Sequence, residues 1–332
     1  MKTKTLISIL NWNGADKTEE CLRSLRDAGY MSREDVKVVV TDNASALEDL
    51  ERLRRLTSAF DFSLVENGVN IGFAPGHNAV IRAAKAEGFA FVWLLNNDAS
   101  VLPGSLEALL DLMAREAKCA CAAPLLIDSV TDEVYFTGAT HSWTSLMPIW
   151  LPTDRFDSAD ATDPKDVWSV GTANLLRLSA LDTVGLMEDR YFAYFEDDEF
   201  GERILQSGWQ TRFAPEARVK HDMPDASAGK RRPFFYYLWF RNQMCFFHRY
   251  APLHGVRWTR LRLLARCVDS AGSLAQAGCL DQANAALLGA CDALRGIGGA
   301  PVLGRKLPKW FTLVCYVLQL LNALHVARLR GR

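Results

Sequence analysis

The sequence of 332 residues lacks the features of several large classes of protein. Its charge is balanced over the whole chain, with 38 Lys and Arg against 39 Asp and Glu, and the acidic charge of residues 1–229 argues against a nucleic-acid binder. Its eight cysteines include no CxxC pair and residues 1–10 show no signal-peptide pattern, which predicts reduced, buried thiols in a cytosolic protein. Long apolar runs are also scarce. Residues 310–327 carry no charge but include Gln319, Asn322 and His325, which favours an interfacial helix over a membrane span.

The charge is unevenly distributed along the chain. Residues 230–332 hold 16 Lys and Arg against 3 Asp and Glu, a net charge of +13, which leaves −14 on residues 1–229. The length predicts two domains, or one large domain with an extension. We place the boundary near 225–232, where the sign of the charge changes. We therefore expect one domain over 1–228 and a basic, mainly helical extension over 229–332 that could face phosphate-bearing lipids.

The first 130 residues alternate between strand-like and helix-like patterns. Strands are expected over 5–10, 36–41, 62–66 and 89–95, and helices over 18–28, 47–58, 79–87 and 103–117. Loops with short strands are expected over 128–165, then a strand over 167–177, a helix over 196–207 and short strands over 210–214 and 218–221. Beyond Pro233 the pattern is helical. Repeated βα units predict an α/β fold with a doubly wound, mostly parallel sheet and a helical C-terminal extension.

Polar runs follow three of the predicted strands, at 11–14, 42–45 and 96–98. Ligands of open α/β sheets bind outside the carboxyl ends of the strands, so these runs predict one site built from several loops. Alternatively, each run only makes turns and helix caps, an interpretation that weakens when all three are taken together.

The glycine-bearing segment 70–78 could bring backbone N–H groups to a phosphate. It has neither a Walker nor a G-x-G-x-x-G pattern, so a structural turn is the other interpretation.

Four consecutive carboxylates, Glu196 to Glu199, stand among aromatic residues. They could be the acidic first turn of a helix, with Arg203 as counter-charge. A general base beside a sugar-stacking surface would explain the aromatics as well. His221 ends the last short strand; it is either a structural histidine or, with Asp98, a ligand of a divalent cation.

These motifs together resemble the family 2 inverting glycosyltransferases of GT-A fold, in the rhamnosyltransferase-like branch. The resemblance covers about residues 4–222, in the family's order, through the segments 8–14, 40–45, 70–78, 94–98, 194–197 and 217–221, with Gly171. Residues 236–237 and 241–242 resemble the family's less distinctive C-terminal extension. Two departures are Asn96, which begins the family's DXD position, and Glu199, where the family usually has Asp.

The resemblance implies a role for each matched residue. The nucleotide-sugar would be bound by Asn11, Asn13, Asp42, Asn70, Gly72, Asn96 and Asn97. Asp98 and His221 would hold Mg²⁺ or Mn²⁺ at the diphosphate, and Gly171 would face the acceptor. Asp197 would be the base that deprotonates the acceptor hydroxyl, with Glu196 orienting it or the acceptor.

The implied activity is a metal-dependent transfer of a hexose with inversion, of rhamnose from its dTDP form or of the sugar of a UDP-linked donor. The acceptor would be a surface glycan or a polyprenyl-diphosphate-linked glycan, reached from the cytoplasm by peripheral attachment to an anionic inner membrane. Nucleic acid is not an expected partner. Two alternatives remain at this point, a sugar-1-phosphate nucleotidyltransferase and a non-catalytic glycan-assembly subunit.

Overall fold

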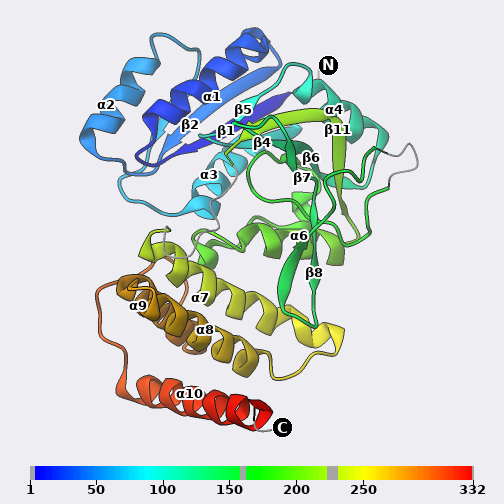
Figure 1. Cartoon of the computed structure of the whole chain (residues 1–332). Helices are drawn as coiled ribbons and strands as arrows, with labels where there is room; N and C mark the ends of the chain where they lie inside the picture. Colours follow the sequence, from blue (N-terminus) through cyan, green and yellow to red (C-terminus); the bar gives the residue numbers. More distant parts are fainter. Residues whose placement is uncertain (1–3, 158–161, 223–230, 331–332) are drawn as a thin grey trace. The chain divides into compact units, whose positions relative to one another are not determined.

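The computed structural model describes residues 4–157, 162–222 and 231–330 and divides the chain into two units (Figure 1). Unit 1 combines Met1–His141, Pro148–Asp189 and Glu196–Met223, and unit 2 combines Ser142–Met147, Arg190–Phe195 and Pro224–Arg332. The boundary expected between 228 and 229 lies outside the described residues.

Unit 1 is built on one large sheet with the strand order β3-β2-β1-β4-β10-β6-β11-β5, and β7 pairs with β6. The strands are β1 Thr5–Asn11, β2 Val36–Asp42, β3 Ser63–Glu66, β4 Phe91–Asn96, β5 Ser100–Val101, β6 Cys119–Asp128, β7 Val134–Phe136, β10 Leu175–Arg177 and β11 Gln210–His221. Strands β3, β2, β1 and β4 are parallel, and β10 runs antiparallel between β4 and β6. Two further strands, β8 Ala139–Ser142 and β9 Met147–Trp150, pair with each other.

Helices cover both faces of this sheet, because its central strands are apolar on both sides. The helices are α1 Ala15–Asp27, α2 Leu47–Leu56, α3 Phe73–Ala86, α4 Ser105–Arg115, α5 Leu181–Val184 and α6 Glu196–Gln206. Successive side chains of β1 alternate: Ile7 and Ile9 lie in one buried cluster with residues of α1, α2 and α4, and Leu6 lies in another with residues of α3, α5 and α6. The predicted α/β, doubly wound fold is therefore confirmed.

Several expected elements differ from the observed ones. Strand β6 lacked a sequence signal because Ala and Cys dominate it and Pro124 interrupts it. Helix α3 begins at Phe73 rather than 79, since Pro75 is tolerated in a first helical turn. The strand expected over 167–177 is reduced to β10, and the two expected over 210–221 form one strand with a register shift between Ala214 and Arg218.

Unit 2 is helical, as expected beyond Pro233, with α7 Pro233–Tyr250, α8 Thr259–Gln276, α9 Leu280–Leu294 and α10 Lys309–Arg330. Aromatic residues of α7, including Phe246 and Phe247, form its core with Leu263 of α8 and Phe311 of α10. No helix within the described residues is both long and apolar enough to cross a membrane. All eight cysteines are free and six are buried.

Candidate active site

The sheet register places polar strand ends beside one another. Asn11 at the end of β1 lies opposite Asp42 of β2, and Leu10 lies opposite Asn96 of β4. These ends belong to neighbouring parallel strands, so the loops that follow them meet at one edge of the sheet. The expected convergence of the first, second and fourth strands therefore occurs in unit 1.

Asn11 is fully buried and connects the first two loops. Its Nδ2 lies 3.0 Å from Asp42 Oδ1, 3.0 Å from Ser45 Oγ and 2.9 Å from Asp49 Oδ1. Its Oδ1 accepts hydrogen bonds from Thr18 Oγ1, at 2.9 Å, and from Asn97 Nδ2, at 3.3 Å. All polar atoms of this side chain thus have protein partners. In this structure Asn11 fixes the loops, and its predicted contact with a nucleotide stays a prediction.

Asn13 and Asp42 shape the start of the next segment. Asn13 has a left-handed backbone, with φ of 54°, and its Oδ1 accepts a hydrogen bond from Ala46 N at 2.7 Å. Asp42 is buried and its Oδ2 accepts one from Ser45 N at 3.0 Å. Carboxylate and amide oxygens at a strand edge suit the hydroxyl and N–H donors of a ribose and a base.

Asn43 ties the second loop to the glycine-bearing segment. Its Nδ2 donates to Asn70 Oδ1, at 2.9 Å, and to Gly72 O, at 3.1 Å. Asn70 Oδ1 also accepts from Gly72 N at 2.9 Å. Gly72 has φ of 96°, which favours glycine, and helix α3 follows it directly. The structure therefore brings the predicted residues Asn70 and Gly72 together through a buried asparagine outside the predicted set.

Asp98 and His221 face each other across two distant parts of the chain. His221 Nε2 lies 3.3 Å from Asp98 Oδ1, and His221 Nδ1 lies 2.8 Å from the Tyr135 hydroxyl. Burial raises the pKa of Asp98, but the hydrogen bond and charge of His221 outweigh it and hold the pKa below its usual value. Asp98 is therefore ionised at neutral pH, as a ligand of a divalent cation must be.

The donor atoms of Asp98 and His221 are of the types that bind divalent cations. The Asp98 carboxylate and the imidazole Nε2 of His221 lie side by side. Ligating histidines characteristically use the other ring nitrogen for a hydrogen bond, as His221 Nδ1 does here with Tyr135. Among the described residues, no group of three or more His, Cys, Asp or Glu side chains is arranged to hold a metal. Phosphate oxygens or water would complete the coordination of a cation held by Asp98 and His221.

The carboxylates in the acidic first turn of α6 bind different partners. Glu199 accepts two hydrogen bonds from Arg203 Nε, at 2.8 and 2.9 Å. The expected counter-charge, Arg203, therefore pairs with Glu199. Asp198 Oδ1 lies 2.8 Å from His141 Nε2. Asp197 accepts two backbone hydrogen bonds, from Asp198 N at 3.0 Å and from Gly171 N at 3.1 Å.

The carboxylates near Asp197 hold protons more tightly than usual. Burial raises the pKa of Asp197 to about 7, the charge of Asp198 adds to the rise, and the two backbone N–H groups offset part of it. Burial also raises the pKa of Asp198 to about 7, and burial followed by the charge of Asp197 raises that of Glu196. The Glu196 Oε2 atom is buried and has no hydrogen-bond partner within the described residues. A carboxyl group whose pKa lies near the working pH is suited to general base catalysis.

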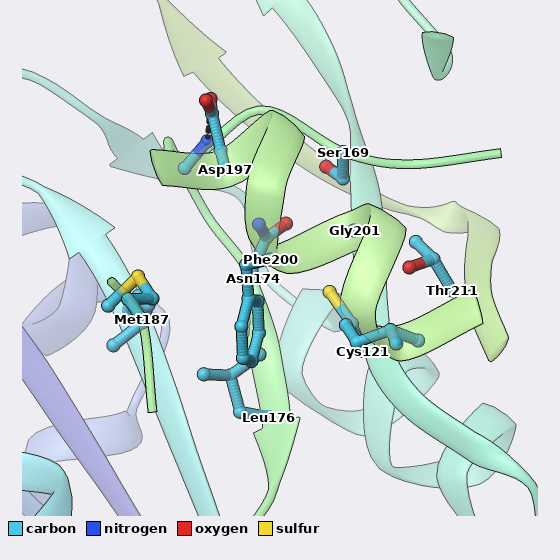
Figure 2. Close-up of a pocket in the computed structure, with 12 residues that line it drawn as sticks. Cys121, Ser169, Asn174, Leu176, Met187, Asp197, Phe200, Gly201 and Thr211 are labelled. Atoms are coloured by element: carbon cyan, nitrogen blue, oxygen red, sulfur yellow. Dashed lines mark hydrogen bonds between the residues drawn. The ribbon is translucent and has the colours of Figure 1, made fainter. Parts of the chain in front are cut away.

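A small cavity lies behind Asp197. It is lined by Ser169, Gly171, Asn174, Asp197, Gly201, Thr211 and six mainly apolar residues, and its volume of about 10 Å³ leaves room for at most one water molecule. Figure 2 shows the Asp197 carboxylate directed away from Met187 and Leu176, toward the backbone nitrogen that binds it. This cavity is too small to hold a sugar.

The loop at Gly171 links Asp197 to the strand edge. Gly171 N binds Asp197, and the next residue, Thr172, accepts a hydrogen bond from Asn96 N at 2.8 Å. The carboxyl end of β4, which leads to Asp98, and the acidic turn therefore flank one short loop. All the predicted site residues lie in unit 1.

Several residues of this network were not among the predicted site residues, including Asn43, Asp49, Tyr135 and His141. Asn43 stands within a polar run that the sequence singled out, so its position was a usable signal. Tyr135 and His141 lie where the sequence has no clear periodicity, and nothing local pointed to them.

Comparison with known proteins decides the family. The model of glycosyl transferase family 2 matches residues 7–185, which is more than half of the chain. The chain belongs to glycosyl transferase family 2. The chain is similar in sequence to the N-acetylglucosaminyl-diphospho-decaprenol L-rhamnosyltransferase of Mycobacterium tuberculosis (strain CDC 1551 / Oshkosh). The two are 28% identical over 222 residues, which covers 60% of this chain and 70% of the relative.

Two solved glycosyltransferase structures have a fold similar to that of this chain. GalNAc-T7 with UDP, GalNAc and Mn²⁺ aligns with a TM-score of 0.55 and 17% identity over 73% of this chain, which spans 47% of that structure. The mannosyltransferase PcManGT of Pyrobaculum calidifontis with GDP-Man and Mn²⁺ aligns with a TM-score of 0.54 and 15% identity, covering 89% of this chain and 88% of that one. The expected GT-A fold is thereby confirmed.

Proposed function

We propose that this chain transfers a sugar, rhamnose from dTDP-rhamnose, onto a polyprenyl-diphosphate-linked or surface-glycan acceptor, with inversion at the anomeric carbon. The observation that carries the proposal is the carboxylate of Asp197, held by two backbone N–H groups with a pKa raised to about 7. The similarity to a rhamnosyltransferase named for an N-acetylglucosaminyl-diphospho-decaprenol acceptor supports the choice of donor and acceptor.

The donor half of the reaction uses the strand edge of unit 1. Asp42, which Asn11 fixes in place, and Asn13 bind the base and ribose, and Asn70 and Gly72 close over the nucleotide. Asn96 and Asn97 complete the pocket on the β4 side, where Asn97 Nδ2 already binds Gly14 O at 3.1 Å. Asp98 and His221 would hold Mg²⁺ or Mn²⁺, which supplies positive charge to the departing nucleoside diphosphate.

The acceptor half uses the acidic turn. The acceptor hydroxyl is a weak nucleophile, and Asp197 removes its proton as the hydroxyl attacks the anomeric carbon. The Gly171 loop orients Asp197 and faces the acceptor. Burial and the charge of Asp197 raise the pKa of Glu196 and so favour its protonated form, which donates a hydrogen bond to the acceptor or to Asp197. Attack opposite the diphosphate gives inversion without a covalent sugar-enzyme intermediate.

We also propose that unit 2 attaches the protein peripherally to the cytoplasmic face of an anionic membrane. Trp310, Leu313, Val317 and Leu320 are exposed by 45–63% and repeat along α10 at spacings of three and four residues, which places them on one helix face. Lys306 and Lys309 precede this face. Cations beside an exposed apolar helix face suit the interface of an anionic bilayer, and each contributes about 1 kcal/mol there.

The activity is tested by transfer assays on the full chain with dTDP-rhamnose, UDP-glucose and GDP-mannose, with Mg²⁺ or Mn²⁺ and a polyprenyl-diphosphate-linked N-acetylglucosamine. We expect rhamnose transfer by the wild type and a loss of about 10²- to 10⁴-fold in kcat for Asp197→Asn. Glu199→Gln is the matched control, since it removes a neighbouring carboxylate that Arg203 already neutralises. Absence of transfer from every donor by folded protein would overturn the proposed activity, and full activity of Asp197→Asn would overturn the assignment of the base.

A further inference from the structure

His141 lies in β8, at the end of the first segment of unit 1. It contacts two stretches of chain that are distant from each other in sequence. Its Nε2 lies 2.8 Å from Asp198 Oδ1. Its ring stacks on the indole of Trp168, with centroids 5.2 Å apart and planes inclined by 8°. The side chains of His141 and Asp198 are 3% and 8% exposed, so this contact is closed to solvent.

The two stretches that His141 joins are those that hold Asp197. One N–H group on Asp197 belongs to Asp198 itself. The other belongs to Gly171, three residues after Trp168. The backbones of Ala139 and Trp168 also exchange hydrogen bonds of 2.9 and 3.1 Å, which sets the stacking partner beside His141.

We propose that His141 is a positioning residue for Asp197, because it fixes both backbone segments whose N–H groups bind that carboxylate. The inference rests on the proposed function, in which Asp197 is the base. The two N–H groups aim the Asp197 oxygens and favour their ionised form. Loosening either segment weakens both effects, so loss of His141 reduces the rate and makes Asp197 harder to ionise.

His141 acts through its shape and hydrogen bond rather than through a charge. Burial lowers its pKa to about 4, which outweighs the raising effects of Glu202, Asp166 and Asp197, so its ring is neutral at working pH. The carboxyl groups that titrate beside Asp197 are those of Asp198 and Glu196. A change in the pH dependence of kcat therefore reports on the carboxyl cluster.

Two substitutions separate the contacts of His141. His141→Phe keeps a ring against Trp168 and removes the nitrogen that binds Asp198. His141→Gln keeps an amide nitrogen near the position of Nε2 and removes the stacking ring. We expect His141→Phe to lower kcat by about tenfold, to move the acid limb of the kcat–pH profile up by about one pH unit and to leave the donor KM unchanged. His141→Gln restores part of both losses.

The matched control is His77→Gln. His77 is also fully buried in unit 1, and its Nδ1 lies 2.9 Å from Ser8 Oγ, whereas the N–H groups that bind Asp197 belong to Gly171 and Asp198. A merely structural loss lowers the melting temperature and leaves the acid limb in place. We expect that result for His77→Gln. An unmoved acid limb in folded His141→Phe would overturn the inference.

If His141→Phe does not fold, two substitutions of its partner, Asp198, test the same contact. Asp198→Asn keeps an atom for His141 to bind, whereas Asp198→Ala removes it, and both remove the same charge. We expect the plateau kcat of Asp198→Ala to be about tenfold below that of Asp198→Asn; equal plateaus would contradict the role of His141. Asp197→Asn is assayed in parallel. If it stays active, the proposed base is wrong; if it is inactive while the His141 and Asp198 variants behave as controls, only this inference fails.

Discussion

Two glycines inside helices should respond in opposite ways to the same substitution. Gly201 lies within α6, and a Cβ added there would come 2.4 Å from Trp168 Cβ. Gly272 lies within α8, and a Cβ added there would meet no atom within 4 Å. Alanine in a helix interior is favoured over glycine by about 1 kcal/mol. Overpacking a buried contact costs about 1–3 kcal/mol, and the upper value applies where the obstacle is next to the backbone.

For Gly201→Ala the clash outweighs the helix preference, which leaves a net loss of about 2 kcal/mol in the free energy of unfolding. In a unit of this size the melting temperature should fall by about 4–8 °C. Gly272→Ala, in the smaller unit 2, should instead gain up to about 1 kcal/mol, or about 3–6 °C. Thermal unfolding followed by circular dichroism measures both. A Gly201→Ala protein as stable as the wild type would refute the close packing of α6 against Trp168.

Three further predictions concern the metal pair, the acidic turn and α10. Tyr135→Phe removes the hydroxyl that binds His221 Nδ1 and should weaken Mn²⁺ binding by about 10- to 100-fold in titration calorimetry with nucleotide present; unchanged affinity would exclude Tyr135 from the metal site. Folding raises the pKa of Asp198 from 3.8 to about 7, so the folded state retains this proton longer and loses stability as pH rises from 4 through 7. The melting temperature of Asp198→Asn relative to wild type should therefore be higher at pH 8 than at pH 5, and a pH-independent difference would contradict the buried carboxyl. Leu313→Ser with Val317→Ser should abolish co-sedimentation with anionic vesicles while unfolding remains cooperative, and undiminished binding would exclude the α10 face as the membrane contact.

The strand edge could be predicted because its signals are local. Buried parallel strands have continuous apolar sequences, and the polar runs after them mark where each strand stops. The carboxyl ends of neighbouring parallel strands meet, so Asn11, Asp42 and Asn96 could be grouped without a structure.

The supporting contacts could not be predicted because they depend on long-range packing. Tyr135 reaches His221 over 86 positions, and His141 reaches Asp198 over 57. Both come from the stretch 128–165, where short strands and loops give no periodic pattern. The burial of Asp197, and hence its raised pKa, likewise follows from tertiary packing around α6.

The most direct test of a metal-dependent nucleotide-sugar site is thermal stabilisation by dTDP, UDP and GDP, each with and without Mn²⁺ or Mg²⁺, on wild type and Asp98→Ala. A nucleotide present at 100 times its Kd adds about 2.7 kcal/mol to the free energy of unfolding. The account predicts stabilisation of the wild type by dTDP that requires the metal and is lost in Asp98→Ala. Folded wild-type protein that responds to no nucleotide, or an Asp98→Ala variant that responds as the wild type does, would contradict it.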